Sequence, residues 1–319
     1  MGKKSLVALG SALVGLEAYN RRVTKLATSL EDQLPVQPTR WPWRFGEVAV
    51  YETGDPHNPP LLLLHGQNAA ASAAEMKEPF ARLSDRFHIF APDLLGYGLS
   101  ERPDIPYTPQ LYIELIGDLL REVVKQPAAV LASSLTSAYA IEAAVADPEW
   151  ITSLVLVCPT GVRTLTEQSG GGKAVEALLR LPVLGQGIFN GIASRRGIRY
   201  FLEGQTYHDK SLVTNSLVEQ YYRTAHVPGA RYSPSAFVSG KLYWDASEAW
   251  SQISQNVLLV WGREAKITPL SDAPAFLATN PGAELQEISP AGILPHDEQP
   301  EQFANLVGAW LERIREAKV

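Results

Sequence analysis

The sequence predicts an α/β fold: a doubly wound, mostly parallel sheet with an inserted helical cap and an N-terminal helical extension. Two observations predict it. Short apolar runs, such as residues 61–64 and 257–260, alternate with helix-periodic segments, which is typical of a parallel sheet covered by helices on both faces. A long, mostly helical stretch then interrupts this alternation between residues 157 and 257. The 319 residues, 45% of them hydrophobic, suffice for one such domain.

Composition narrows the classes of function. The net charge of −6 and the charged fraction of 19% offer no basic surface of the kind that nucleic acid requires. Cys158 is the single cysteine, which excludes an internal disulfide and suits a reducing compartment. No Cys/His group has the spacing of metal ligands. We therefore expect no nucleic-acid partner, no metal and no cofactor, and a cytoplasmic location, with membrane association through the N-terminal helix left open.

Residues 3–30 predict one long amphipathic helix within an N-terminal region of residues 1–40. Leucines recur along it at spacings of three and four, and Asn20 interrupts the apolar stripe. Its uncharged stretch covers only residues 5–16, whereas a bilayer core of about 30 Å needs roughly 20 apolar residues. The pairs that flank this stretch, which lipid headgroups would attract, are Lys3-Lys4 and Arg21-Arg22.

Three interpretations of this helix remain open. Membrane attachment is the first, docking of a partner protein is the second, and packing on its own domain is the third. Small residues four apart, Ala8 and Ala12, would let another helix approach closely. We therefore expect membrane or partner-protein contact through residues 3–30, as an interfacial or a spanning helix.

The rest of the chain divides into a core of residues 41–160 and 251–319 and a helical cap of residues 161–250. In the cap, residues 166–173 predict a polar, glycine-rich loop, and residues 174–249 are mostly helical and rich in aromatic side chains. Most of these aromatics would form the cap's own core, and some would face an apolar pocket. The expected core strands are 48–53, 61–64, 88–91, 128–132, 154–157, 257–260 and 285–288, and the expected helices are 112–124, 138–146 and 303–314.

Five segments of the core carry specific motifs. The first, residues 61–67, ends in His65-Gly66-Gln67, and the second, residues 91–100, contains the pattern D-x-x-G-x-G-x-S. The third, residues 130–136, contains Ser134, and the last two segments along the chain are residues 258–262 and 291–300. In these segments the chain resembles the capped, serine-elbow α/β-hydrolase family over about residues 45–319. The resemblance implies an oxyanion loop, a bracing loop, a nucleophile elbow, a strand before the triad acid and a segment that presents the histidine. It also implies that His65 and Asp93 are structural.

The resemblance places Ser134 at the nucleophile position of the elbow. A strand ends there, one residue takes a strained backbone conformation and a helix begins, which holds the serine oxygen at the top of the sheet. The backbone N–H groups of Leu135 and Gln67 would form the oxyanion hole. Alanine and threonine, Ala132 and Thr136, stand where the family has flanking glycines. The alternative is that Ser134 only caps a helix.

The two groups that should activate Ser134 are missing from their expected positions. Ala265 stands where the family's acid is expected, and Ile293 stands where its histidine is expected. A serine hydroxyl is a weak nucleophile without an adjacent base, and losing the base of a triad costs on the order of 10⁶ in turnover. His296 is the candidate substitute base, although Pro295 and the acidic residues after His296 indicate a helix start that turns it towards solvent.

The sequence therefore favours a hydrolase-fold protein with an incomplete Ser-His-Asp triad. It would bind a small hydrophobic ligand in its capped pocket or act as a subunit of a larger complex. The first alternative is an ester, lactone or thioester hydrolase that uses Ser134 with a relocated histidine, such as His296, His208 or His226. The second is cofactor-free chemistry in the same pocket. Whether the chain is an enzyme stays open at this point.

Overall fold

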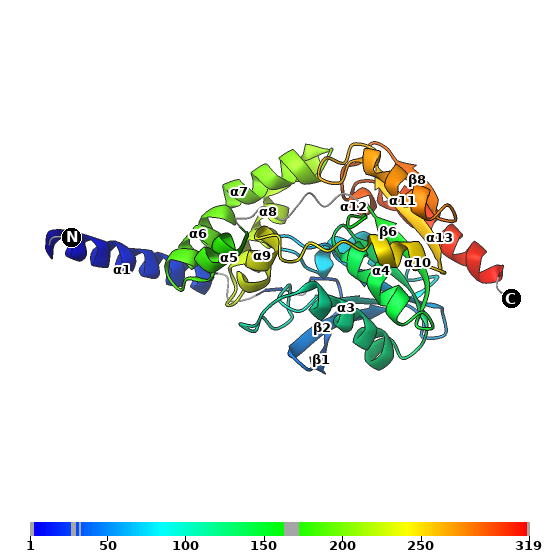
Figure 1. Cartoon of the computed structure of the whole chain (residues 1–319), viewed down its shortest axis with the longest axis horizontal. Coiled ribbons are helices and arrows are strands. Elements are labelled where there is room, and N and C mark those ends of the chain that lie inside the picture. The colour runs from blue at the N-terminus through cyan, green and yellow to red at the C-terminus, as the bar shows by residue number, and fades with distance from the viewer. Residues whose placement is uncertain (1–2, 27–29, 32, 163–171, 318–319) are drawn as a thin grey trace.

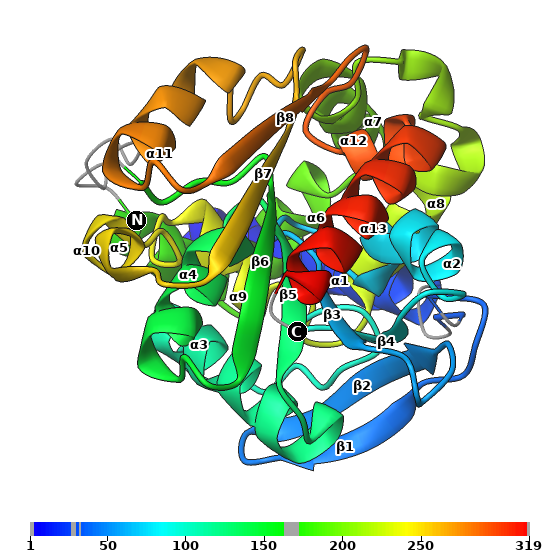
Figure 2. The same ribbon diagram turned by 90° about the vertical axis from the view of Figure 1, so that its right-hand side faces the viewer.

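An eight-stranded sheet organises the computed structural model, which describes residues 3–26, 30–31, 33–162 and 172–317. The strand order is β1-β2-β4-β3-β5-β6-β7-β8, and Figure 2 shows the twist of this sheet. β1 and β4 both pair antiparallel with β2, and the remaining pairs are parallel. The strands are β1 (Thr39–Trp43), β2 (Gly46–Thr53), β3 (Pro60–Leu64), β4 (His88–Pro92), β5 (Ala128–Ser133), β6 (Ile151–Val157), β7 (Asn256–Gly262) and β8 (Glu284–Ile288).

The central strands are apolar along their whole length because both faces of the sheet are buried. Successive side chains of a strand point to opposite faces, so Leu62 and Leu64 join one hydrophobic cluster, whereas Leu61 and Leu63 join the other. The first cluster includes helices α3 (Pro109–Asp118), α4 (Thr136–Ala146), α10 (Ser247–Gln252) and α11 (Ala273–Thr279). The second includes α2 (Lys77–Arg82) and α13 (Pro300–Glu316). The predicted doubly wound fold is confirmed.

Three short elements were not predicted. β1 is an edge strand that contains Pro42, and an edge position tolerates proline because one side of the strand needs no ladder hydrogen bonds. Trp43 at its end is buried and its indole Nε1 donates to Asp118 Oδ2 at 2.9 Å. The other missed elements are α11 and α2, of which α2 follows the 3₁₀ helix η1 (Ala73–Met76) on the second face of the sheet.

The segment between β6 and β7 is helical, as predicted, and lies at the end of the molecule away from the C-terminus (Figure 1). The polar loop predicted at residues 166–173 falls mostly outside the described residues. Phe189 is buried within the inserted helices, whereas Phe201, Tyr221 and Phe237 line a cavity, so the aromatics divide as expected. The helices are α5 (Gly172–Arg180), α6 (Leu184–Ile192), α7 (Arg195–Phe201), η3 (Leu202–Thr206), η4 (Lys210–Leu212), α8 (Asn215–His226) and α9 (Tyr232–Val238).

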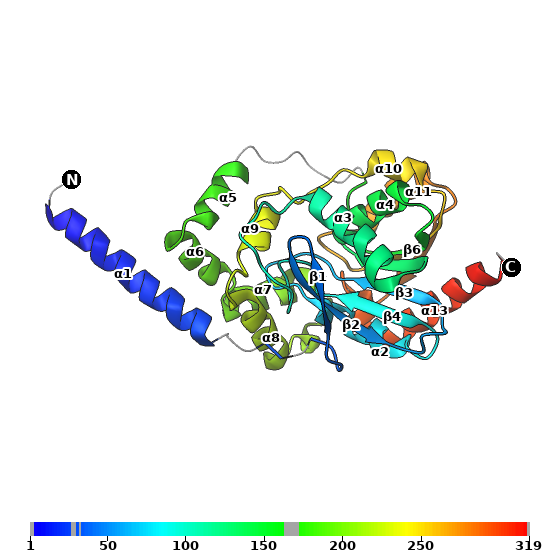
Figure 3. The ribbon, with the colours of Figure 1, turned by 90° about the horizontal axis from the view of Figure 1, so that it is seen from below.

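The N-terminal helix α1 (Lys3–Leu26) projects from the body of the molecule in Figures 1 and 3. It ends earlier than predicted, because Leu30 is not helical; residues 27–29 lie outside the described part. Its second half packs on α6, where Leu16 lies against Gly187 and Val23 is buried. Asn20 is buried too. Its Nδ2 donates to Val183 O at 2.9 Å and its Oδ1 accepts from Asn190 at 2.9 Å. Asn20, which interrupts the apolar stripe, therefore anchors α1 to α6.

Packing on the chain's own domain thus accounts for the second half of α1. Its first half lies in more open surroundings, because a side chain added at Gly10 or Gly15 would meet no atom within 4 Å. Among the described residues, no helix combines the length and apolar character needed to cross a bilayer.

Candidate active site

Ser134 occupies a sharp turn between a buried strand and a helix. β5 ends at Ser133, Ser134 has a positive φ of 52°, and α4 begins at Thr136. A positive φ is strained for any residue with a Cβ, so the surroundings must impose it. The Ser134 N–H donates to Val157 O of the neighbouring strand at 2.9 Å, which holds the turn. The strand–turn–helix geometry predicted for the elbow is present, and the catalytic role of Ser134 stays a prediction.

Hydrogen bonds accommodate the larger residues that flank this turn. Thr136 is fully buried, and its Oγ1 donates to His65 O at 2.8 Å. Ser137 Oγ donates to Ala132 O at 3.0 Å. Both hydroxyls thus bond to carbonyl groups of adjacent strand ends, so their burial leaves no unpaired donor. Leu135, between them and Ser134, is buried as well.

The loops after β3 and β4 are braced by buried polar side chains. His65 Nε2 accepts from the Leu94 N–H at 3.0 Å, and burial lowers the pKa of His65 to about 4. Asp93 accepts from the backbone N–H groups of Ala73 and Leu99 at 2.6 and 2.7 Å. Gly98 has a φ of 48°, and a Cβ there would meet the Asp93 carboxylate at about 2 Å. These contacts support the structural roles expected for His65 and Asp93.

A cavity of about 240 Å³ opens beside Ser134. The sheet side contributes Gln67, whose Nε2 is buried and finds no hydrogen-bond partner in the described structure. The lining contains no lysine, arginine or histidine. The lining residues are Gly66, Gln67, Asn68, Glu75, Ser133, Ser134, Phe201, Thr206, Tyr221, Phe237, Tyr243, Ile267, Ile293 and Leu294.

The expected acid and histidine positions are occupied by apolar packing. Ile293 lines the cavity together with Ser134, and its N–H donates to Thr206 O at 3.1 Å. Ala265 lies in the tight turn after β7, where its N–H donates to Gly262 O at 3.1 Å, and its side chain is buried in the first core cluster. The backbone of both segments is thus ordered as the motif requires, without the ionisable groups.

The proposed substitute base does not reach the cavity wall. His296 begins α12 (Pro295–Glu298), so the predicted helix start is confirmed, but the predicted solvent-facing side chain is wrong. The ring is fully buried and lies 5.5 Å from the Phe303 ring. Desolvation lowers its pKa to about 4, and an interaction with the Glu75 backbone partly opposes this shift. Packing against the core directs this side chain inward. The acidic residues that follow His296 had favoured a solvent-facing side chain.

The other candidate histidines also lie off the cavity. His208 is exposed. His226 is buried in α8, where its Nδ1 lies 2.6 Å from Tyr222 O. All six histidines are within the described residues, and the cavity lining includes none of them. Cys158 is buried with a pKa raised to about 12, so it is no thiolate.

Glu75 is a cavity residue that the sequence analysis missed. Its Oε1 accepts from the Gly66 N–H at 3.0 Å, and a Cβ on Gly66 would lie 3.4 Å from both carboxylate oxygens and 3.5 Å from Ser133 Oγ. A carboxylate therefore sits against the loop that precedes Gln67. Burial raises its pKa, hydrogen bonds from Ser133 and the Gly66 backbone partly oppose this shift, and the nearby Asp297 adds to it. One signal was available: between Asp55 and Lys77, Glu75 is the only charged residue of the sequence.

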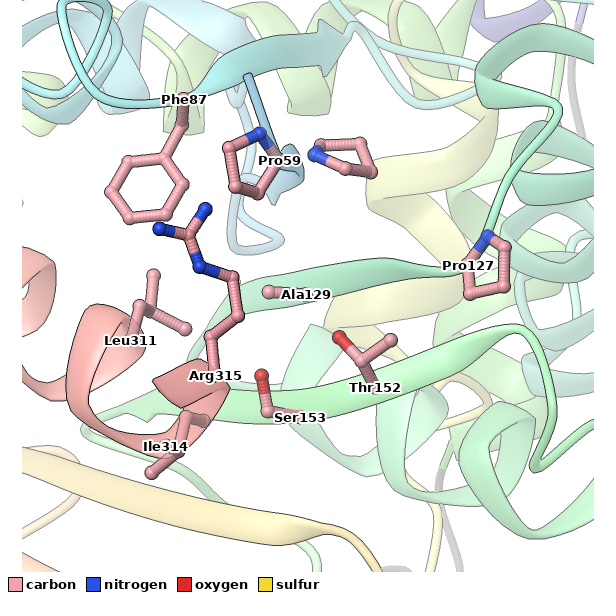
Figure 4. A pocket seen from close by; sticks show the side chains of 10 residues that line it. Pro59, Phe87, Pro127, Ala129, Thr152, Ser153, Leu311, Ile314 and Arg315 are labelled. Atoms are coloured by element: carbon pink, nitrogen blue, oxygen red, sulfur yellow. The ribbon is translucent and has the colours of Figure 1, made fainter. Parts of the chain in front are cut away.

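A second cavity, of about 230 Å³, lies at the amino-terminal ends of strands β3, β5 and β6 (Figure 4). Pro59 and Pro127 precede the first residues of β3 and β5, and Thr152 is the second residue of β6. Since a strand of about six residues spans roughly 20 Å, this cavity is remote from Ser134. Ligand sites in open parallel sheets lie at the carboxyl ends of the strands, which favours the Ser134 cavity. Among the described residues there is also no group of three metal-ligating side chains.

Known proteins resemble this arrangement in sequence and in fold. Residues 61–306 match the alpha/beta hydrolase family. A 2-hydroxymuconate semialdehyde hydrolase of Pseudomonas putida is 27% identical over 262 residues, which cover 79% of this chain and 86% of the relative. An uncharacterized protein of Mycobacterium tuberculosis is 26% identical over 269 residues, covering 82% and 77% of the two chains.

Solved structures extend the resemblance. A meta-cleavage product hydrolase from Pseudomonas fluorescens superposes with a TM-score of 0.71 at 20% identity, covering 87% of this chain and 98% of that one. A membrane phospholipase A, described as a bacterial virulence factor, superposes with a TM-score of 0.70 at 19% identity, covering 97% and 96%. With the family match spanning most of the sheet and the elbow, this chain belongs to the alpha/beta hydrolase family.

Proposed function

We propose that this chain binds a small, largely apolar ligand beside Ser134, under a cap formed by residues 161–250, and has lost Ser-His-Asp acyl transfer. One observation carries the proposal. Ala265 and Ile293 replace the acid and the histidine around a serine that keeps the elbow conformation. The second candidate function is hydrolysis of an ester, lactone or thioester by Ser134 with His296 as a relocated base.

The loss of the base weakens Ser134 as a nucleophile. Its hydroxyl ionises only when a neighbouring group takes the proton, and the apolar side chain of Ile293 disfavours a bare alkoxide further. His296 would have to leave its core position beside Phe303 to serve. That movement would expose a buried aromatic contact, which argues against the second candidate function.

The charge of Glu75 argues in the same direction. Acyl transfer places a negative charge on the substrate oxygen, which the N–H groups of Gln67 and Leu135 would have to stabilise. Glu75 puts a carboxylate on the Gly66 N–H, one residue before Gln67, and no basic side chain in the lining compensates it. An ionised Glu75 would repel that oxyanion. The site thus resists the transition state of its family.

The cavity suits a small ligand with an apolar body and an acceptor atom. Four aromatic rings and three aliphatic side chains make up half of its 14 lining residues. Gln67 Nε2 supplies a buried donor without a partner in the described structure, which a ligand oxygen would satisfy. The hydrolases named among the relatives act on 2-hydroxymuconate semialdehyde and related acids, which are likewise small.

The test is active-site labelling beside ligand binding. A fluorophosphonate probe and short nitrophenyl esters should give no labelling by intact mass and no turnover above the Ser134→Ala variant. Hexan-1-ol and ethyl butyrate should bind in calorimetry, and Ile293→Trp should abolish that binding by filling the cavity. Stoichiometric labelling that disappears in Ser134→Ala would establish the hydrolase alternative instead.

We also propose that helix α1 (Lys3–Leu26) attaches the protein to a membrane without crossing it. The support is the short uncharged stretch of residues 5–16 between basic pairs, and the open surroundings of Gly10 and Gly15. The fold likeness to a membrane phospholipase A covers 97% of this chain, so it reaches into α1. Removing residues 1–26 should release the protein from vesicles, and unchanged partitioning would refute the attachment.

A further inference from the structure

Exposed apolar side chains concentrate on three neighbouring elements. α1 contacts α6, and α6 contacts α5. Figures 1 and 3 both place these helices together at the end of the molecule opposite the C-terminus. Of the 15 large hydrophobic side chains that are exposed in the described residues, eight lie on these helices or on the turn between α5 and α6. They are Leu13, Val14, Tyr19, Val175, Leu178, Leu181, Leu184 and Ile192.

The charge of the same region is opposite to that of the rest of the chain. Residues 3–26 carry five basic residues and one acidic residue, and residues 172–192, which include α5 and α6, carry two basic residues and one acidic residue. These two segments therefore have a net charge of +5. Because the whole chain has −6, the remaining residues carry −11. A surface that combines apolar side chains with this excess of cations is complementary to anionic lipid headgroups over an acyl layer, and the acidic remainder would be repelled from them.

The position of the charges favours a helix that lies on the bilayer over one that enters it end first. Insertion of the first half of α1 would carry Lys3 and Lys4 into the hydrocarbon, at roughly 3 kcal/mol for each lysine. Lying in the interface leaves both basic ends of α1 among the headgroups. Asn20, through Val183 and Asn190, holds the helix against α6, so the two would reach the surface as one body.

We infer that α1, α5 and α6 form one docking face for an anionic phospholipid membrane, so that the inserted helices bind lipid together with the N-terminal helix. This inference rests on the attachment proposed above and extends it. It names the lipid class and adds α5 and α6 to the contact.

The test is co-sedimentation of the full chain with vesicles of phosphatidylcholine alone and of phosphatidylcholine with about one third phosphatidylglycerol. Binding should be stronger by about tenfold or more on the anionic vesicles and should weaken as salt is raised. Combining Leu178→Ser, Leu184→Ser and Ile192→Ser should weaken it by at least about tenfold, because three half-exposed apolar side chains no longer enter the interface. The matched control Leu212→Ser, an exposed leucine on η4, should bind as the native chain does.

Circular dichroism and thermal unfolding should show that the triple variant keeps the native fold, since its three side chains are exposed. If Arg21→Gln and Arg22→Gln reduce binding while the triple variant does not, attachment through α1 stands and the wider face is refuted. Equal binding to both kinds of vesicle refutes the anionic lipid class. If no variant and no lipid changes the partitioning, both the face and the attachment fail.

Discussion

The two halves of the candidate site differ in what they keep. On the side of β3, β4 and β5, Ser134 retains its positive φ, and the surrounding loops retain a network of buried hydrogen bonds through His65, Asp93 and Thr136. On the side of β7 and β8, the backbone is equally ordered. There the two positions that would carry ionisable groups, Ala265 and Ile293, carry apolar side chains.

This difference separates the polar side chains that are needed for folding from those that would be needed only for catalysis. His65, Asp93 and Thr136 bond to backbone groups that would otherwise be buried unpaired, so the fold depends on them whether or not the site reacts. A triad acid and histidine bond mainly to each other and to the serine, so replacing both by apolar residues removes a buried polar network without orphaning the backbone. Under the function proposed above, the second half of the site would have lost its chemistry and kept its fold.

Restoring the missing pair should have the largest effect. Ala265→Asp combined with Ile293→His should raise hydrolysis of nitrophenyl acetate by about 10³-fold over the native chain, because position 293 already faces the Ser134 cavity. Steady-state kinetics would measure it. Each single variant should gain little, and adding Ser134→Ala should abolish the gain. A native chain with Ser134-dependent turnover of its own would contradict the contrast between the two halves.

His296, the buried histidine on α12, should reduce the free energy of unfolding as the pH falls. The unfolded chain binds a proton at His296 below a pH of about 6.5, whereas burial lowers the pKa in the folded state to about 4. Folding stability is therefore lost as the pH falls through this window, by about 2–3 kcal/mol at pH 4.5 for this residue alone. Urea unfolding of His296→Leu should show a loss of stability between pH 7 and 4.5 that is smaller by this amount than in the native chain. An unchanged slope in His296→Leu would mean that His296 is a hydrated, reactive group.

Much of the fold was predictable because its signals are local. An apolar run such as residues 61–64 admits few other interpretations than a strand buried on both faces, and the order of the motifs then determines the sheet. β1 escaped prediction because Pro42 opposes a strand unless the strand lies at an edge, and edge position is a property of the whole sheet. From the sequence alone, Asn20 interrupts the apolar stripe of the N-terminal helix. Its role as an anchor was not predictable, because its hydrogen-bond partners lie about 170 residues away in the chain.

The candidate site was predictable in part for the same reason. Ser134 follows from a strand and a helix that adjoin it, and the replacement by Ala265 and Ile293 follows from motif position. The inward side chain of His296 and the cavity role of Glu75 depend on contacts with Phe303 and Gly66, which are only seven and nine residues away. These contacts form only when α12 packs on α13 and η1 packs beside the end of β3, so the local sequence pattern does not reveal them. Side-chain direction was therefore the step that the sequence left undetermined.

Glu75 provides a smaller test, on the electrostatics of the elbow half. Glu75→Gln should raise the affinity of the cavity for hexanoate by about tenfold, because it removes a negative charge that has no basic partner in the lining, and it should leave hexan-1-ol binding unchanged. Calorimetry at neutral pH measures both. Since burial raises the pKa of Glu75, the native chain's discrimination against hexanoate should fade as the pH is lowered. Equal affinities in the native chain and the variant would show that the carboxyl is already protonated at neutral pH.

The hydrogen bond of Thr136 gives the smallest expected effect. It tests whether the half of the site around Ser134 is kept for folding, because the variants differ only in whether the Oγ1 donor is present. Thr136→Val keeps the side-chain shape and removes the Oγ1 donor that meets His65 O at 2.8 Å, so it should cost about 1–2 kcal/mol of unfolding free energy in urea. Thr136→Ser keeps the donor, loses only a methyl group and should cost about 1 kcal/mol or less. If valine is instead as stable as threonine, the carbonyl of His65 needs no partner, and the elbow half would be retained for chemistry and not for folding.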